Sequence, residues 1–286
     1  MAVRTPPVLW AARVLWLLLP LGVGDLLVGR PGVAGGTSWA AWVVGLAALF
    51  VAHPAALTVL RVVGPLPLVV GTAVAVASAP GPLGWAGLAA AAVVWICILT
   101  AEVGDFYVNG ASYGDERRFT LRAPAVLTWA VVPAVWLVMA APVVGAVVLA
   151  GHRRWVLAGL VALVAVPVVA AGTRSIHRLA TRWLVMVPAG ITVVDPLNLT
   201  EPVLFAARDL TRFGPAHVAT GARDLTGGAS GLVLQLDVTT PVEVTPTVGR
   251  GRTTSPEEVR AVLVCPSRPG AVLAEADRRG LAVSRD

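Results

Sequence analysis

Residues Thr173–Pro196, TRSIHRLATRWLVMVPAGITVVDP, mark the point at which the character of the chain changes. The segments before this stretch are apolar, whereas those after it alternate apolar and polar residues and are separated by turn residues. Trp183–Pro188 and Gly190–Asp195 predict two β-strands joined by a Pro-Ala-Gly turn. Three arginines precede these strands and are typical of the depth of lipid headgroups: Arg174, Arg178 and Arg182. We therefore expect a membrane-spanning half followed by a β-rich half.

The composition excludes an ordinary soluble domain. Of the 286 residues, 57% are hydrophobic and only 13% are charged, and the mean hydropathy is +0.79. One soluble domain of this size cannot bury so much apolar surface. All 22 basic residues are arginines, so a phosphate-binding P-loop lysine and a Schiff-base lysine are both excluded. The arginines are dispersed beside apolar segments, which indicates membrane topology and not nucleic-acid binding.

The apolar half contains six segments long enough to span a bilayer, which requires about 20 apolar residues. They are residues 8–28, 38–60, 62–79, 83–101, 123–150 and 155–172. The third segment is the shortest and contains Pro65 and Pro67. In the fourth, Gly84 and Gly87 favour close packing against a neighbouring helix. Residues 1–172 are therefore predicted to form a transmembrane helical domain.

The distribution of arginines predicts the orientation of these spans. With a cytoplasmic N-terminus, nine arginines fall on the inner side: Arg4, Arg13, Arg61, Arg117, Arg118, Arg122, Arg174, Arg178 and Arg182. Three fall on the outer side: Arg30, Arg153 and Arg154. Positive charge favours the cytoplasmic side of a membrane. We expect a multi-pass protein of the plasma membrane with its N-terminus and its C-terminal domain in the cytoplasm.

The predicted loop Glu102–Arg122, EVGDFYVNGASYGDERRFTLR, joins the fourth and fifth spans and carries most of the chemically active side chains. Its candidate interaction residues are Asp105, Tyr107, Asn109, Tyr113, Asp115, Glu116, Arg117 and Arg118. One interpretation is an ordered turn whose acids and arginines pair at the headgroups. Another is a docking or regulatory surface for the C-terminal domain, which lies on the same side after two further spans. A catalytic or ligand site is the third.

The catalytic interpretation has little support in the sequence. Gly110–Gly114 matches the G-x-S-x-G pattern of hydrolases, but that pattern works only between a strand and a helix of a large sheet. The carboxylates Asp105, Asp115 and Glu116 could act as bases or bind a metal in an enzyme of lipid-linked substrates. The adjacent Arg117 and Arg118 would neutralise them. We expect no cofactor and no metal, and we favour a protein without catalytic activity.

The polar half, residues 173–286, is predicted to be a β-rich domain with a terminal helix. Beyond the first hairpin, residues 202–205 form a short strand and residues 209–213 form either its continuation or a turn. Residues 231–238 and 242–248 predict a hairpin around Thr239–Pro241, and residues 259–265 predict another strand. Residues 269–280 predict an amphipathic helix with its apolar face turned inward.

This pattern resembles the bacterial pleckstrin-homology-like (PH-like) domains of small membrane proteins. The resemblance covers Arg174–Leu281 and is carried by the Arg182–Val187 strand, its partner Gly190–Asp195, the segment Val203–Phe213 and the terminal helix. The helical half resembles polytopic actinobacterial membrane proteins. The resemblance implies a scaffolding or lipid-proximal binding domain without catalysis, and it transfers no binding residue to this chain.

Two functions therefore remain open besides an enzyme. The first is a helical anchor that presents a PH-like domain at the cytoplasmic face to lipid or protein partners. The expected partners are the bilayer, another membrane protein or a second copy of the chain. The second is a transporter or permease component, which His53, Pro54 and the other prolines of the predicted spans would suit. No nucleic-acid partner is expected.

Overall fold

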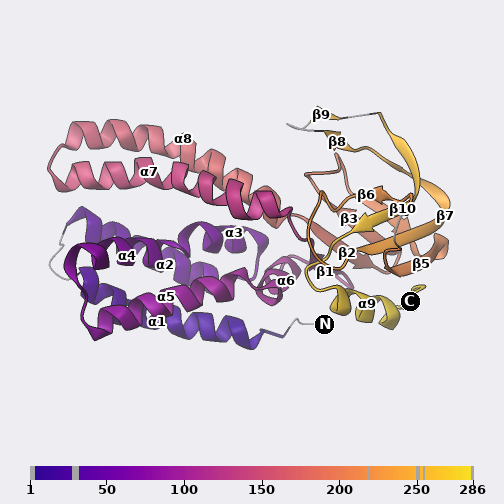
Figure 1. Cartoon of the computed structure of the whole chain (residues 1–286), viewed down its shortest axis with the longest axis horizontal. Coiled ribbons are helices and arrows are strands. Elements are labelled where there is room, and N and C mark those ends of the chain that lie inside the picture. The colour runs from indigo at the N-terminus through magenta and orange to yellow at the C-terminus, as the bar shows by residue number, and fades with distance from the viewer. Residues whose placement is uncertain (1–3, 28–31, 218–219, 249–251, 254, 285–286) are drawn as a thin grey trace. The chain divides into compact units, whose positions relative to one another are not determined.

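The structure is a computed structural model that describes residues 4–27, 32–217, 220–248, 252–253 and 255–284. The chain forms two compact units, each assembled from segments that are separated in the sequence (Figure 1). The helical unit comprises Val3–Tyr107 and Val132–His177, and the β unit comprises Val108–Val131 and Arg178–Asp286. After the last span the β unit resumes at Arg178, and it also takes in the segment between the fourth and fifth spans.

The described part of the chain contains six helical segments that are long and apolar enough to cross a membrane. They are Pro7–Gly24, Val33–Phe50, Pro54–Val76, Pro82–Leu99, Leu127–Gly151 and Trp155–Ala180. The helices concerned are α1 (Pro7–Leu27), α2 (Val33–Phe50), α3 (Pro54–Val63), α4 (Leu66–Ser78), α5 (Pro82–Leu99), α7 (Val132–Gly151) and α8 (Trp155–Ala180), with a π-helical turn at Leu127–Val131. A multi-pass membrane protein is confirmed at this level.

The second and third spans divide differently from the prediction. Helix α2 ends at Phe50, and His53 with Pro54 begins α3 instead of lying inside a span. The Nδ1 atom of His53 accepts a hydrogen bond from the backbone N–H of Ala55 at 3.1 Å, so this histidine caps the helix. The prediction that 38–60 is one helix was wrong: the backbone becomes extended at Val51, and Pro54 opens a new helix in the first turn, where its missing N–H costs no hydrogen bond.

Helices α1 and α5 cross with their backbones in contact at two glycines. A Cβ atom added to Gly22 would lie 2.5 Å from Cα of Gly87, and one added to Gly87 would lie 2.6 Å from the carbonyl carbon of Gly22. The predicted close packing of the 83–101 helix is therefore confirmed. Gly24 lies two residues further along α1, and a Cβ atom added there would meet no other atom within 4 Å. It therefore provides a matched control.

We expect Gly22→Ala to destabilise the helical unit by about 1–3 kcal/mol, because an added methyl group has no room at this crossing. Gly24→Ala should be neutral or slightly stabilising, since alanine is the better helix former. Cys97 packs against the core of the helical unit, so in a Cys265→Ala background its labelling by a thiol-reactive dye during heating measures unfolding of this unit. Equal unfolding temperatures for the two variants would contradict the close crossing.

The core of the helical unit is apolar and is supplemented by paired indoles. Trp16 donates from Nε1 to the carbonyl of Trp42 at 3.0 Å, and Trp42 donates back to the carbonyl of Trp16 at 2.8 Å. Each indole N–H is thereby satisfied, which is necessary where water is absent. The two reciprocal bonds join α1 to α2.

The first sheet of the β unit has the strand order β1-β2-β3-β4, with every neighbouring pair antiparallel. Its strands are β1 (Arg117–Thr120), β2 (Trp183–Val187), β3 (Gly190–Val194) and β4 (Val203–Ala206). The predicted hairpin of β2 and β3 is confirmed. Strand β1 comes from before α7 and α8, and Figure 1 shows it beside β2. A hairpin of two membrane spans is thus inserted between the first and second strands of one sheet.

The second sheet has the order β5-β7-β10-β6. Its strands are β5 (Leu210–Pro215), β7 (Leu234–Val244), β10 (Glu257–Val264) and the short β6 (Arg223–Asp224), which runs parallel to β10. The predicted hairpin around Thr239–Pro241 was wrong, because β7 continues through these residues. Two short strands, β8 (Thr247–Val248) and β9 (Arg252–Thr253), pair separately. The chain then forms α9 (Pro269–Arg278), close to the predicted helix.

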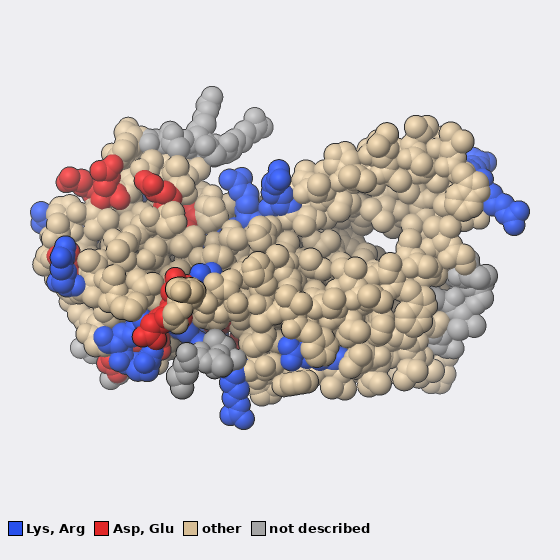
Figure 2. Space-filling view, turned by 180° about the vertical axis from the view of Figure 1, so that it is seen from behind, with Lys and Arg blue, Asp and Glu red and all other residues tan. Residues whose placement is uncertain are grey.

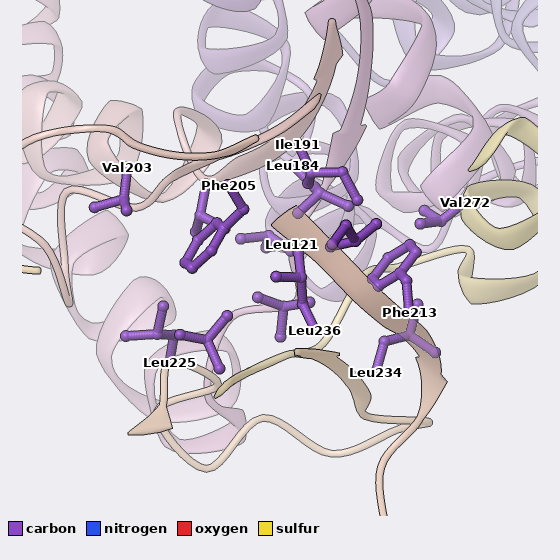
Figure 3. Close-up of a cluster of buried hydrophobic side chains, with 14 of the residues drawn as sticks. Leu121, Leu184, Ile191, Val203, Phe205, Phe213, Leu225, Leu234, Leu236 and Val272 are labelled. Carbon is purple, nitrogen blue, oxygen red and sulfur yellow. The ribbon is translucent and has the colours of Figure 1, made fainter. Parts of the chain in front are cut away.

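A single apolar core holds the two sheets and α9 together (Figure 3). Phe205 of the first sheet and Phe213 of the second are fully buried, as is Val272 of α9. The core also contains Phe119 and Leu121, which arrive with the β1 segment. Apolar burial of this kind is the main stabilising term of a small domain, so the β unit depends on residues from both sides of the inserted helical hairpin.

Charged residues are distributed unequally between the units. In Figure 2 the helical unit is mostly tan with a few arginines, whereas the acidic residues seen on this face gather mainly on the β unit, where arginines accompany them. The large apolar side chains exposed on the helices are mainly valine, leucine and tryptophan. Such a surface is stable against lipid and not against water.

Candidate functional site

The segment Glu102–Arg122, expected as a loop, is ordered into a helix and a strand. Helix α6 spans Ala101–Asn109 and ends in a turn, after which β1 begins at Arg117. The boundary between the two units falls at Tyr107 and Val108. The eight candidate residues therefore divide between the two units.

Asp105 and Tyr107 belong to the helical unit and are buried. The hydroxyl of Tyr107 donates to the carbonyl oxygen of Ala48 at 3.0 Å, and its ring packs edge-on against Phe106 with centroids 5.6 Å apart. Burial raises the pKa of Tyr107 further than the positive charge of Arg13 lowers it. Both residues are therefore buried, and Tyr107 belongs to the core of the helical unit.

Asn109 secures the outer edge of β1. Its Nδ2 donates to the carbonyl oxygen of Arg118 at 2.6 Å, and its Oδ1 accepts from the backbone N–H of Arg118 at 2.9 Å. The side-chain amide thus forms the two hydrogen bonds that a neighbouring strand would form. An exposed strand edge invites pairing with other chains, and Asn109 removes part of that edge.

The turn before β1 carries the residues that remain exposed. Tyr113 is 88% exposed, and Gly114 and Asp115 are exposed beside it. Glu116 is held from two sides, since its Oε2 accepts from Nη2 of Arg118 at 2.8 Å and from the backbone N–H of Tyr113 at 3.3 Å. Burial alone would raise the pKa of Glu116, but these two hydrogen bonds and the Arg118 charge have the larger combined effect. The pKa of Glu116 is therefore lowered. The expected pairing of acids with arginines therefore holds for Glu116 and Arg118.

Both arginines of β1 also lie near aromatic rings. The guanidinium of Arg118 lies 5.2 Å from the ring centre of Trp183, and that of Arg117 lies 5.8 Å from the ring centre of Phe119.

Ser112, the serine of the G-x-S-x-G match, donates to the carbonyl of Asn109 at 2.6 Å in a turn that follows a helix and precedes a strand. This order is the reverse of that in a nucleophile elbow.

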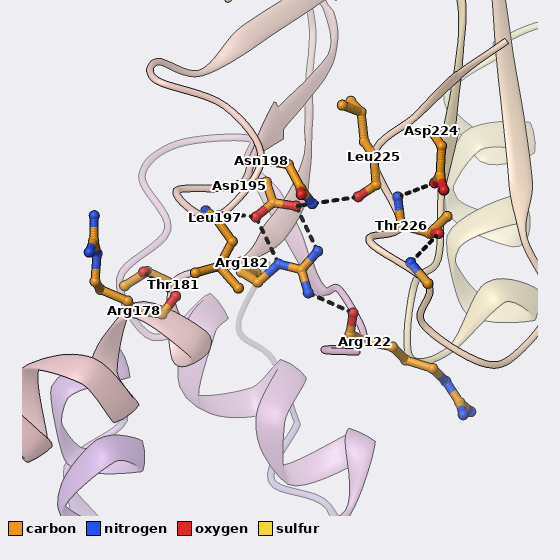
Figure 4. A network of polar contacts seen from close by, with 11 residues as sticks. Arg122, Arg178, Thr181, Arg182, Asp195, Leu197, Asn198, Asp224, Leu225 and Thr226 are labelled. Carbon is orange, nitrogen blue, oxygen red and sulfur yellow. Dashed lines mark hydrogen bonds and ion pairs between the residues drawn. The ribbon is translucent and has the colours of Figure 1, made fainter. Parts of the chain in front are cut away.

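The three arginines assigned to the membrane surface have different environments. Arg174 and Arg178 are exposed in the last turns of α8. Arg182, in contrast, is 1% exposed. Its Nε and Nη2 donate to Oδ1 and Oδ2 of Asp195 at 2.8 and 2.7 Å, and its Nη1 donates to the carbonyl of Arg122 at 2.8 Å (Figure 4). The prediction of a headgroup role for Arg182 was therefore wrong.

Asp195 and Asn198 extend this buried network. Asp195 also accepts from the backbone N–H of Leu197 and from Nδ2 of Asn198, which in turn donates to the carbonyl of Leu225 at 2.9 Å. A signal for the ion pair existed in the sequence: Trp183 pairs with Val194 across the β2–β3 hairpin, so the next residues outward, Arg182 and Asp195, face each other. The network joins the two ends of the β2–β3 hairpin to the segment before α7 and to Leu225, which directly follows β6.

Arg279, the residue that caps the C-terminus of α9, contacts the turn before β1. Arg279 donates from Nη2 to the carbonyl of Asp115 at 2.6 Å and from Nε to Glu275 at 2.7 Å. Arg278 donates to both carboxylate oxygens of Glu275 at 2.8 and 2.6 Å. The hydrogen bonds from Arg278, together with the hydrogen bond from Arg279 and the charges of both arginines, lower the pKa of Glu275 to about 2. Burial acts in the opposite direction and is outweighed.

The stability of the β unit should therefore depend on Glu275 at acidic pH. Because folding lowers this pKa from 4.5 to about 2, the stabilisation is fully present above pH 4.5 and is lost as the pH falls through the folded value. We expect Glu275→Gln to lower the unfolding temperature at pH 6, and this difference should shrink progressively between pH 4.5 and pH 2. Thermal unfolding followed by tryptophan fluorescence measures it, and a difference that stays constant with pH would contradict the assignment.

Metal ligands and relatives give no further guide to chemistry. Within the ranges that the structure describes, no group of three or more histidine, cysteine, aspartate or glutamate side chains could hold a metal ion. Cys97 and Cys265 are both free thiols, and burial raises the pKa of Cys265. The chain matches no family model, no curated protein and no solved structure.

Proposed function

We propose that this protein is a membrane-anchored binding protein, in which the helices hold a PH-like β domain at the cytoplasmic face for lipid or protein partners. The observation that carries the proposal is the construction of the β unit from segments on both sides of the α7–α8 hairpin. Because the sheet takes strands from both sides of this hairpin, the domain is fastened to the bilayer at two points.

The order of the elements supports a PH-like domain. An antiparallel four-stranded sheet is followed by the antiparallel strands β5, β7 and β10 and then by α9. The short β6 is an addition at the edge of the second sheet. PH-like domains act by binding, and the charged turns of this β unit offer surface for that.

The distribution of arginines supports the cytoplasmic orientation. Arg117, Arg118 and Arg122 precede the fifth span, and Arg174 and Arg178 end the sixth. Two spans separate these groups, so both lie on one side of the membrane, as one shared sheet requires. Arg153 and Arg154 in the α7–α8 connection are fewer, as the positive-inside rule expects of the outer side.

A transporter is less well supported than an anchor. Among the described residues of the helical unit, the buried side chains are mainly leucine, alanine and valine, and the buried polar ones are Arg13, Thr58 and Asp105. His53 was expected inside a span, but it caps the N-terminus of α3. A pathway for a polar substrate requires polar groups at mid-membrane, and the apolar core favours an anchor.

Two measurements test the proposed function. Reporter fusions that are active on only one side of the membrane should place the C-terminus in the cytoplasm and the 151–154 connection outside. Extraction of the full chain into polymer-bounded nanodiscs, compared with a chain ending at Ala180, should then reveal lipids or proteins that depend on the β unit. A C-terminus outside the cell, or identical co-extracted lipids and proteins for both chains, would refute the proposal.

A further inference from the structure

The residues that lead into the fifth span define a depth relative to the bilayer. This span begins at Leu127, and Trp129 in its first turn is 80% exposed. Tryptophan is enriched at the level of the lipid headgroups. Arg122 and Pro124, which belong to the β unit and precede the span by a few residues, therefore lie at the membrane surface.

A loop of the second sheet packs directly on these two residues. The backbone carbonyl of Ser230 accepts a hydrogen bond from Nη1 of Arg122 at 3.3 Å. A Cβ atom added to Gly227 would lie 3.3 Å from Cγ of Pro124, and one added to Gly231 would lie 3.2 Å from Nε of Arg122. The loop Thr226–Leu232 is therefore held at the same depth as the start of the span.

The loop is built so that its backbone and one leucine can meet the membrane surface. Gly227, Gly228 and Gly231 have φ values of 63°, 78° and 143°, which favour glycine, so the loop presents little side-chain bulk. At its end Leu232 is 51% exposed, an apolar side chain beside the headgroup-level residues. The backbone N–H groups of Thr226 and Gly228 are bound by Asp224 and Thr226, which hold the loop in place.

The charge beside the loop favours an anionic surface. The exposed side chain of Arg122 points away from the buried Arg182 network in Figure 4. The nearby acid, Asp224, accepts the backbone N–H of Thr226 at 2.7 Å. Guanidinium groups bind phosphate oxygens well, and phosphate is what a phospholipid surface offers at this depth.

We propose that the Thr226–Leu232 loop is a lipid-contacting element, in which Leu232 enters the headgroup–acyl boundary and Arg122 binds the phosphates of anionic phospholipids. This inference rests on the proposed function and names a contact surface for it. The contact would supplement the two covalent attachments and would fix the rotation of the β unit on the membrane.

The depth of the loop can be measured in the full chain. In a Cys97→Ala, Cys265→Ala background, Leu232→Cys is labelled with an environment-sensitive fluorophore and reconstituted into nanodiscs of phosphatidylcholine with or without phosphatidylglycerol, each containing spin-labelled quencher lipid. The matched control is Ala189→Cys, an exposed position in the β2–β3 turn, at the end of β2 far from the α8 exit. Quenching should be strong at residue 232 and weak at residue 189.

The contribution of the arginine is tested separately. Arg122→Gln keeps the backbone carbonyl that Arg182 requires, and it should reduce the lipid-bound fraction of the loop by about fivefold in anionic nanodiscs only. Equal quenching at 232 and 189, or an Arg122→Gln variant that behaves as the parent in anionic lipid, would overturn the proposal.

A measurement on the unaltered chain tests the lipid contact without depending on whether the cysteine variants fold. Photoactivatable phospholipids reacted with the unaltered chain should label peptides containing residues 226–232, and unlabelled peptides there would also overturn the proposal. The orientation test of the proposed function is independent of this outcome. A cytoplasmic β unit with a water-exposed loop would refute the lipid contact alone, whereas an external C-terminus would refute the proposed function.

Discussion

Arg182→Met is expected to destabilise the β unit by about 3–5 kcal/mol, because it leaves the buried carboxylate of Asp195 without its cation. For a unit of this size such a loss lowers the unfolding temperature by about 10–20 °C. Cys265 is buried in the β unit, so in a Cys97→Ala background the labelling of this thiol during heating reports the unfolding of the β unit directly.

Two control variants distinguish the ion pair from a general effect of losing an arginine. Arg178→Met removes an exposed arginine four residues earlier and should change stability by no more than about 0.5 kcal/mol. Arg182→Met combined with Asp195→Leu should recover part of the loss, since an apolar pair can replace a buried ion pair. Recovery should stay incomplete because Leu197 and Asn198 also bind Asp195. If Arg182→Met were as stable as the parent, the network would have no structural role.

The second large effect concerns the β unit without its membrane hairpin. A fragment that starts at Arg174 lacks β1, and with it Phe119 and Leu121 of the core. Losing two such side chains costs at least about 5 kcal/mol, which is comparable with the whole stability of a small domain. We expect this fragment to aggregate, as judged by gel filtration.

Restoring β1 should rescue the isolated domain. The backbone N–H of Leu121 donates to the carbonyl of Arg182 at 3.0 Å, so a short Gly-Ser linker can join residues 113–122 to residues 181–286 in place of the inserted helices. This fusion should be monomeric and should unfold cooperatively. The same fusion with Phe119→Asp is the control and should behave like the fragment without β1. A folded fragment without β1 would contradict the split construction of the sheet.

The sequence allowed the local parts of the fold to be predicted. The spans follow from composition, the β2–β3 hairpin from alternation around a turn, and α9 from its amphipathic pattern. The errors arose where a local signal was overruled. Thr239–Pro241 was assigned to a turn, but β7 runs through it: the residues on both sides pair with β10, whose register shifts at this point.

The candidate site was harder to predict because it depends on contacts that are distant in sequence. Nothing local shows that Arg117–Thr120 completes a sheet whose next strand begins at Trp183. Once that pairing is known, Asn109 becomes an edge cap and Asp105 and Tyr107 become core residues of the helices. The burial of Arg182, in contrast, was predictable from its position opposite Asp195.

The separation of β1 from β2 has a consequence for biosynthesis. The carbonyl of Arg122 and the guanidinium of Arg182 that binds it are 60 residues apart, so a ribosome adding about 5–20 residues per second delivers them several seconds apart. During that interval α7 and α8 must enter the bilayer. Only a correctly inserted pair returns the nascent chain to the side of the membrane on which β1 lies. Completion of the sheet is thus an intrinsic check on insertion, and a chain that fails it exposes an unfinished domain to the quality-control proteases of the cell.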